Sequence, residues 1–279
     1  MEKLKSGKSK IKSIINIKTQ GKIFERAKDL SLQGQLLSLA AEEESDVTWK
    51  SFAFTLPKSL LKFCLSSAIN VLPSLSNLRR WGKSTTDKCP RCGWTETPKH
   101  LLSGCRVFLE QGRYTARHNA VLSQIVRHID QDRFTVYADL EGRRFNGETI
   151  PPRILVTSEI PDLVLVDNES GEMGVWELTV CYEDRFQASK EYKENKYACL
   201  ISDLSQKTSV GYETIEIGAR GYINSRNRNV LRDLHSLTTG ISLKEFIASI
   251  GRTALMLSYY IFVSRHSNSW LDPHFESAE

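Results

Sequence analysis

A cluster of cysteine and histidine residues constrains the fold of this chain more than any other feature of its sequence. The stretch CPRCGWTETPKHLLSGC has the spacing C-x2-C-x7-H-x4-C, formed by Cys89, Cys92, His100 and Cys105. A C-x2-C pair on a tight turn presents two thiolates to one ion, and His100 and Cys105 are about one helical turn apart, so they can complete a tetrahedral site. Because protein ligands fill all four positions, the spacing predicts a structural zinc site.

The residues around this cysteine cluster favour the same interpretation. Gly93, directly after the second cysteine, suits a tight turn. The nearby cations Lys88, Arg91 and Lys99 help thiolates to ionise. The alternative is four unrelated residues in a loop, and the close spacing with intervening proline and glycine disfavours it.

Cysteine usage also indicates the redox compartment. Three of the six cysteines lie in the cluster, which fits a reducing environment better than a disulfide framework. The other three, Cys64, Cys181 and Cys199, stand alone in apolar settings, where cysteine behaves as a small buried hydrophobe.

Composition and targeting signals narrow the functional class. The net charge of +5 and the pI near 8.8 favour an anionic partner. The opening residues MEKLKSGKSKIKSIINIK are basic but lack the apolar segment of a signal peptide. The most apolar run, residues 254–263, is far shorter than the roughly 20 residues that cross a membrane. We therefore expect a soluble intracellular protein without a membrane partner.

The order of predicted elements indicates the fold class. The chain length allows one sizeable core with an accessory module, or two domains. The Lys-rich residues 1–28 are expected to be a solvated tail, with an electrostatic arm for nucleic acid as the alternative. Periodicity predicts helices over 59–72, 107–129, 188–204, 227–237 and 242–266, and strands over 134–140, 159–167, 174–182 and within 213–223. This order predicts a mixed α/β domain.

Two carboxylates lie in the predicted hairpin IPDLVLVDNESGEMGVWELTV, at Asp162 and Glu177. A turn centred on Glu169 and Ser170 places the two carboxylates directly opposite each other. A turn centred on Ser170 and Gly171 places them one diagonal apart. Both registers put them on one face, about 5–8 Å apart between β-carbons. Apolar residues flank both acids, so these are expected to be central strands.

The chemistry of such a pair favours a metal site. Two carboxylates held together inside an apolar sheet repel each other and lose their hydration, and a divalent cation removes that cost. The following helix adds Lys190 and Lys193 on one face with Tyr197. Two acids, one metal ion and one lysine are the parts used to hydrolyse a phosphodiester. The alternative, equally open from residue types, is that Asp162 caps a strand and Glu177 pairs with a lysine.

Several segments resemble one protein family. Residues 72–126, with RRWGK before the cysteine cluster and RYTARHN after it, resemble the carboxyl-terminal region of non-LTR retrotransposon polyproteins of the restriction-enzyme-like endonuclease class. The segments ELTV, KENKYACL and EIGARGYI and the terminal helix through Trp270 look similar as well, so the resemblance covers about residues 48–270.

The resemblance implies a fold and a domain order. In that family a Cys-Cys-His-Cys knuckle lies between a reverse transcriptase and a PD-(D/E)xK-type nuclease, which nicks DNA to prime reverse transcription. We then expect a basic tail and helical linker over 1–80, a zinc knuckle over 81–106, and a restriction-endonuclease-like mixed sheet flanked by helices over 107–279.

The resemblance also implies roles for the hairpin acids. Asp162 and Glu177 become ligands of a catalytic Mg²⁺ and Lys193 the catalytic lysine, with Lys190 beside it. Thr179 stands where a simple E-x-K motif carries its lysine, so that role passes to the following helix. The segment TVYADL lacks the second aspartate of a polymerase motif, and we expect no polymerase activity in this chain.

The implied partner is DNA, with the RNA of the element as a second nucleic acid, in the nucleus and without a small-molecule substrate. Phosphate contacts are expected from basic residues around the cysteine cluster and in the helix after it: Arg79, Arg80, Lys83, Arg91, Arg113 and Arg117. Three functions remain open: a Mg²⁺-dependent DNA endonuclease, a nucleic-acid-binding relic that keeps the fold without cutting, and an interaction protein retained by a host.

Overall fold

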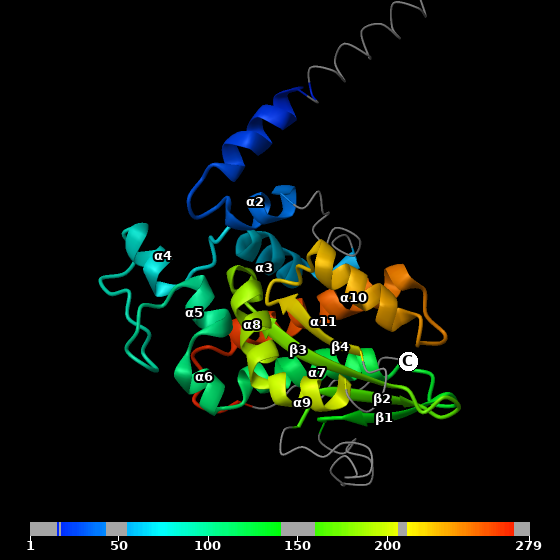
Figure 1. The fold of residues 1–279 in the computed structure, drawn as a ribbon. Helices are drawn as coiled ribbons and strands as arrows, with labels where there is room; N and C mark the ends of the chain where they lie inside the picture. Colours follow the sequence, from blue (N-terminus) through cyan, green and yellow to red (C-terminus); the bar gives the residue numbers. More distant parts are fainter. Residues whose placement is uncertain (1–15, 17, 43–54, 141–159, 206–210, 271–279) are drawn as a thin grey trace, which may run out of the picture.

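A four-stranded mixed sheet forms the centre of the described part of the chain (Figure 1). The computed structural model describes residues 16, 18–42, 55–140, 160–205 and 211–270. The strands follow the order β1 (Phe134–Ala138), β2 (Leu163–Asp167), β3 (Met173–Cys181) and β4 (Gly211–Gly218). The first three pair antiparallel, and β4 pairs parallel with β3. The predicted α/β class is confirmed.

The β2–β3 hairpin takes the first of the two registers expected from the sequence. Leu163 pairs with Trp176, and the same alignment places Asp162 opposite Glu177. β3 is longer than β2 and continues past this point to Cys181, paired there with β4. The two acids therefore lie where β2 stops and β3 continues.

Asp167 fixes the turn of this hairpin. Its carboxylate accepts the backbone N–H groups of Glu169 at 2.9 Å and Ser170 at 3.0 Å. Gly171 follows with a φ of +71°, a conformation that glycine adopts without strain. Turn chemistry thus sets the register that the apolar pattern of the strands leaves open.

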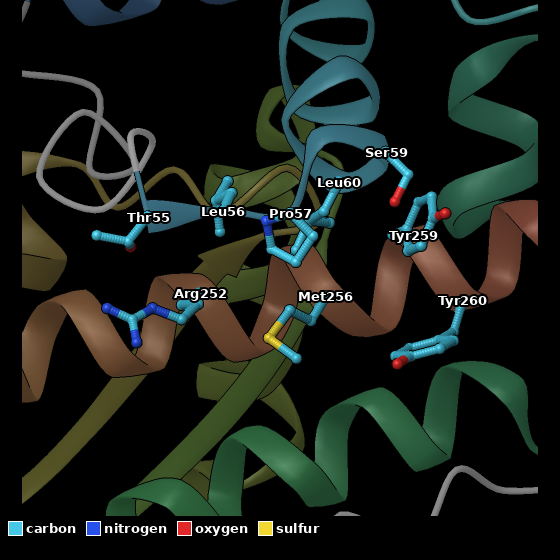
Figure 2. Close-up of a pocket in the computed structure, with 9 residues that line it drawn as sticks. All are labelled: Thr55, Leu56, Pro57, Ser59, Leu60, Arg252, Met256, Tyr259 and Tyr260. Carbon is cyan, nitrogen blue, oxygen red and sulfur yellow. The ribbon is translucent and has the colours of Figure 1, made fainter.

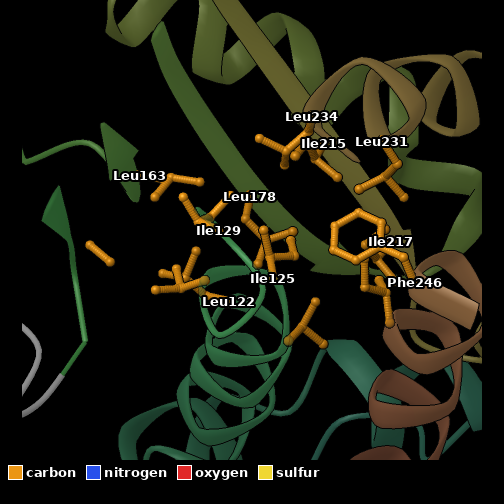
Figure 3. Close-up of a cluster of buried hydrophobic side chains, with 14 of the residues drawn as sticks. Leu122, Ile125, Ile129, Leu163, Leu178, Ile215, Ile217, Leu231, Leu234 and Phe246 are labelled. Atoms are coloured by element: carbon orange, nitrogen blue, oxygen red, sulfur yellow. The ribbon is translucent and has the colours of Figure 1, made fainter. Parts of the chain in front are cut away.

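Helices cover both faces of the sheet (Figure 1). On one face, α7 (Arg113–Val126), α10 (Ser225–His235) and α11 (Leu243–Val263) enclose the main core. Figure 3 labels part of this core: Leu122, Ile125, Ile129, Leu163, Leu178, Ile215, Ile217, Leu231, Leu234 and Phe246. On the other face, the 3₁₀ helix η4 (Glu183–Arg185) leads into α8 (Phe186–Lys196) and α9 (Ala198–Ser205). Each fully buried Leu or Ile stabilises the fold by about 1.5–3 kcal/mol.

A second core joins the cysteine cluster to the rest of the protein. α3 (Lys58–Ala68), α5 (Pro98–Ser103) and α6 (Arg106–Glu110) contribute to it together with α11, and α4 (Leu75–Arg80) leads from α3 to the cluster. Its buried side chains include Phe63, Leu101, Cys105, Phe108 and Phe262. Apolar packing therefore continues across both boundaries expected for the knuckle.

Two helices that were expected to be continuous are broken. Residues 107–129 form α6 and α7, separated at Gly112, whose φ is +74°. Residues 188–204 fall in α8 and α9, separated at Tyr197. The ring of Tyr197 is buried, and its hydroxyl donates to the carbonyl of Ile160 at 3.0 Å. The single helices predicted from periodicity are wrong here because apolar spacing continues across both breaks.

The amino-terminal part of the described chain lies at one end of the molecule (Figure 1). Residues 18–28 are helical and mostly exposed, and residues 1–15 of the basic tail lie outside the described residues. α2 (Gln35–Glu42) packs through Leu36 into a small cluster with Phe186 and Tyr222. This contact connects the segment before the cysteine cluster to the sheet domain.

The length and composition of α11 would allow it to cross a membrane. The helix has 21 residues and a mean hydropathy of 1.5 in its most apolar window, and 56% of that window is buried within the fold. The apolar stretch is longer than the run 254–263 seen in the sequence. Burial in both cores accounts for its composition.

Candidate active site and metal cluster

Among the residues that the structure describes, side chains occupy the position of a neighbouring strand where β3 continues past β2. The backbone N–H of Leu178 donates to Asp162 Oδ2 at 2.8 Å, and the backbone N–H of Asp162 donates to Glu177 Oε1 at 3.1 Å. These bonds fix both carboxylates against the strand that carries one of them. Asp162 is 7% exposed and Glu177 fully buried.

Lys193 completes the predicted acid–lysine set. Its Nζ lies 3.3 Å from Asp162 Oδ2 and forms an ion pair with Glu177 Oε2. The structure therefore brings together three residues that lie far apart in the sequence. One ammonium group contacts both buried carboxylates and partly neutralises their charge.

The position of α8 determines which of its lysines reaches the acids. Glu183 is the first residue of η4, which joins β3 to α8. It forms a buried ion pair with Arg220 at 2.7 Å, and this pair fixes the start of the connection to α8. Lys190, three positions before Lys193, pairs with Glu194 at 2.7 Å. Within the described residues, Lys193 is thus the α8 lysine that contacts the acids, and Lys190 lies beside the set.

His118 belongs to the site and was not identified as a site residue from the sequence. It reaches the acids from α7, on the opposite face of the sheet from α8. Its Nε2 lies 3.4 Å from Asp162 Oδ1 and 3.2 Å from the carbonyl of Leu178, and its Nδ1 lies 3.0 Å from Asn119 Oδ1. In the sequence, His118 occupies a position in the apolar period of a helix, which predicts a core residue. The polar Asn119 next to it is the one sequence feature that could have indicated a site residue here.

The electrostatics of the set are asymmetric. Burial raises the pKa of Asp162, but the hydrogen bond and charge of His118 and the charge of Lys193 outweigh it and hold that pKa well below its usual range. Burial, followed by the charge of Asp162, raises the pKa of Glu177 to about 7. Burial lowers the pKa of Lys193, yet the two acids raise it overall. One acid is therefore firmly ionised, and its neighbour resists ionisation.

A polar layer on β4 extends the site below α8. Thr214 lies beside Glu177 in the parallel register, and Thr214 and Glu216 are both buried. Thr214 Oγ1, Glu216 Oε1 and Tyr212 Oη have no hydrogen-bond partner among the described residues, while Glu216 Oε2 pairs with Arg226 at 2.7 Å. Buried polar atoms in this situation are typical positions for ordered water or ions.

The acids fit a divalent cation in their chemistry. Carboxylate oxygens are the ligands that Mg²⁺ prefers, and two of them from facing strand positions are typical of catalytic magnesium sites. Lys193 contacts oxygens of the same two carboxylates. A bound cation and the Lys193 ammonium would therefore compete for these oxygens.

The four predicted cysteine-cluster ligands come together in space. Their ligand atoms all lie within 4.8 Å of one another, and Cys92 Sγ lies 3.3 Å from His100 Nε2. This set could hold a metal ion, and three sulfurs with one imidazole nitrogen suit zinc. Burial lowers the pKa of His100, so the neutral imidazole that a metal needs is favoured. Burial raises the pKa of Cys105 to about 12, so without a bound cation this residue stays a thiol.

Local structure presents these ligands in pairs. The first pair lies on a short hairpin in which the N–H of Cys89 donates to the carbonyl of Trp94 at 2.6 Å, and Gly93 takes a φ of +79°. In the second pair, His100 lies within α5 and Cys105 follows that helix, and the Thr97 side chain caps α5 by accepting the N–H of His100 at 3.0 Å. Cys105 is the N-cap residue of α6.

The predicted phosphate-binding residues divide into two groups. Arg79, Arg80 and Lys83 are exposed around α4. Arg91 is half-buried and donates to the carbonyl of His266 and to the side chain of Asn268. The first group is available to a nucleic acid, and Arg91 joins the hairpin to the carboxyl-terminal segment.

Arg113 and Arg117 are not available on the surface, which corrects their predicted role. Both are fully buried. Arg113 donates to the carbonyls of Ser264 and Ser267, each at 2.9 Å. Arg117 donates to the carbonyl of Leu102 at 2.8 Å and to that of Val180 at 3.1 Å. Burial lowers the pKa of both guanidiniums, that of Arg117 to about 10. Their charges satisfy backbone carbonyls inside the fold.

A pocket of about 260 Å³ lies between the start of α3 and α11 (Figure 2). Its lining is mainly apolar, with Pro57 and Leu60 from one side and Met256 and Tyr259 from α11. None of the residues that line it belongs to the acid–lysine set or the cysteine cluster, so it is separate from the candidate site.

The amino-acid sequence matches no protein-family model and no curated protein sequence.

Proposed function

We propose that this chain is a Mg²⁺-dependent DNA endonuclease of the PD-(D/E)xK type that carries a structural zinc ion at its cysteine cluster. The observation that carries the proposal is the meeting of Asp162, Glu177 and Lys193 at one point of a mixed sheet. Each comes from a different element, and the three supply the groups that phosphodiester hydrolysis needs. A nuclear location is part of this proposal.

Each residue of the set has a distinct role in this proposal. Mg²⁺, when bound, supplies Lewis acidity and lowers the pKa of an attacking water. Asp162 and Glu177 would hold it through carboxylate oxygens, and His118 with the N–H of Leu178 keeps Asp162 in orientation. Lys193, released from the carboxylates, stabilises negative charge that develops on the phosphate.

Zinc has a structural role in the proposal. Cys89, Cys92, His100 and Cys105 would supply all four ligands of a zinc ion, which would leave none for a substrate. Cys105 also lies in the core shared with α3 and α11. A bound ion would therefore hold the basic hairpin in a fixed position on the sheet domain.

Nicking of supercoiled plasmid with and without Mg²⁺ tests the catalytic role. We expect Asp162→Asn and Glu177→Gln each to abolish Mg²⁺-dependent nicking, since each removes a carboxylate ligand with little change in shape. Affinity for DNA should stay nearly unchanged, because phosphate anchoring uses the exposed residues around α4. Glu191→Gln, on the exposed side of α8, is the matched control and should nick like the wild type.

Two outcomes would contradict this assignment. Equal nicking by the wild type and Asp162→Asn would show that the reaction occurs elsewhere in the chain. A folded wild-type protein that binds DNA but never nicks it would favour the second candidate described next.

The second candidate is a nucleic-acid-binding relic, and one observation favours it. Lys193 contacts both acids, so the site is electrostatically compensated without a divalent cation. A protein that has lost catalysis can keep such a site because it is stable on its own. Absence of binding to any nucleic acid would instead favour an interaction protein.

A further inference from the structure

Two tryptophans are exposed on the small body formed by α4 and the cysteine hairpin. The exposed fraction is 75% for Trp94 and 43% for Trp81. The other two tryptophans of the described residues, Trp176 and Trp270, are half-buried and pack against the two cores. Tryptophan is highly buried on average, so two exposed indoles on one small body indicate a binding surface.

Hydrogen bonds hold the backbones of the two tryptophans in one rigid unit. Arg79 of α4 forms an ion pair with Asp87 of the hairpin at 2.9 Å. The backbone N–H of Glu96 donates to the carbonyl of Asp87 at 2.8 Å, and Glu96 Oε1 accepts the N–H of Leu75 at 2.9 Å. The two ends of α4 are thus tied to the two strands of the hairpin. A preformed aromatic surface loses little conformational entropy when it binds a flat partner.

The charge around the two indoles identifies the class of partner. Residues 75–95 carry five Lys or Arg and one acid, and that acid is paired with Arg79. Arg80, Lys83 and Lys88 are exposed on the same body. Positive groups alternating with aromatic rings are the usual surface for unpaired nucleic acid, because cations follow the backbone while bases stack on the rings.

Base pairing decides which form of nucleic acid fits. In a duplex the bases stack on one another and their faces are covered, whereas an unpaired strand exposes them. We infer that Trp81 and Trp94 stack on unpaired bases of DNA, with Arg80, Lys83 and Lys88 on the flanking phosphates. The choice of DNA rests on the proposed function, in which DNA is the substrate.

Binding of short labelled oligonucleotides, without added divalent cation, tests this inference. Trp94→Ala should weaken binding of single-stranded DNA about 5- to 150-fold, the range expected for one lost base–aromatic stack. Trp94→Phe should retain most of the affinity because phenylalanine keeps an aromatic face. A strand of equal length made only of abasic sites has the same phosphates, and its affinity should not change in Trp94→Ala.

Two controls separate stacking from charge and from surface hydrophobicity. Lys83→Ala should weaken every anionic strand and lower the slope of log affinity against log salt by about one unit. Leu109→Ala removes another exposed apolar side chain, on α6, and should change neither affinity nor slope.

Three binding results would overturn the inference, and so would a fourth, from competition. The three are unchanged single-strand affinity in both Trp81→Ala and Trp94→Ala, abasic strands bound as tightly as normal ones, and RNA bound at least tenfold more tightly than DNA of the same sequence. Competition by polyglutamate as strong as by DNA would also count against it. Asp162→Asn should bind single strands like the wild type, so a failure of nicking leaves this result standing.

Discussion

The cysteine cluster and the acid–lysine site are both places where like groups crowd together, but they are assembled in opposite ways. The four cluster ligands lie within seventeen consecutive residues, and their ligand atoms lie within 4.8 Å of one another. The acid–lysine site draws His118, Asp162, Glu177 and Lys193 from four segments, and Lys193 supplies the positive charge internally. The first site is local, and we propose that it depends on an added ion, while the second is non-local and is electrostatically compensated by Lys193.

The largest expected effect of this difference is the loss of zinc. We expect Cys105→Ser to bind far less than one zinc ion per chain and to lower Tm by about 10–20 °C, because structural zinc contributes directly to folding. Elemental analysis and thermal melts measure both effects. Cys199→Ser, which changes an exposed cysteine outside the cluster, should keep full zinc and the wild-type Tm. Metal-free wild-type protein with an unchanged Tm would remove the basis of the comparison.

Removing the internal cation should make the second site resemble the first. Lys193→Met removes the ammonium that contacts both Asp162 and Glu177 and leaves Glu177 buried without its ion-pair partner, which should cost about 3 kcal/mol of unfolding free energy. Millimolar Mg²⁺ should restore much of that loss in the variant and change the wild type little. Nicking should fall on the order of a hundredfold, as for other lost transition-state charges. Urea unfolding with and without Mg²⁺ measures the stability effect.

A matched lysine variant controls for the general effect of removing a charge. Lys244→Met, exposed in the first turn of α11, should alter neither stability nor its response to Mg²⁺. An equal response to Mg²⁺ in the wild type and in Lys193→Met would mean that the cation does not bind at the acids.

The smallest expected effect concerns the turn that sets the hairpin register. The N–H groups of Ser170 and Glu169, with the charge of Arg133, lower the pKa of Asp167 to about 2. A carboxyl with a lowered folded-state pKa stabilises the fold above its unfolded-state pKa of 3.8, and this contribution is lost as pH falls through 2. Asp167→Asn should therefore lower Tm slightly near neutral pH, and its difference from the wild type should shrink below about pH 4. A difference that is independent of pH would mean that another interaction fixes the turn.

The two sites also differ in how far the sequence predicts them. The ligand set Cys89, Cys92, His100 and Cys105 can be predicted from spacing alone, because a tight turn brings the first two together and about one helical turn brings the last two together. For Asp162 and Glu177 the apolar pattern leaves two registers open. The structure selects one through the Asp167 turn, a side-chain interaction that periodicity does not contain.

Residues that depend on tertiary contacts were missed or misassigned from the sequence. His118 meets Asp162 only because α7 crosses beneath β3. Arg113 and Arg117 have a residue type typical of surfaces, but both lie inside, where they satisfy carbonyls at ends of helices and strands. The helix breaks at Gly112 and Tyr197 interrupt patterns that remain apolar on both sides. Periodicity describes which face is buried, and it does not describe what the buried polar groups bind.

Within the described part of the chain, β3 has no strand neighbour on one side beyond Trp176, and we expect the side chains along this stretch to protect the protein from self-association. Leu178 and Val180 direct backbone groups to the side where β2 has ended, and Asp162, His118 and Arg117 bind them. An open strand edge is a template for a strand of another molecule, and proteins commonly cover such edges with charged side chains. The aspartate proposed to hold the catalytic metal thus also closes a sheet edge. Selection against aggregation can therefore preserve Asp162 even in a chain that no longer cuts DNA.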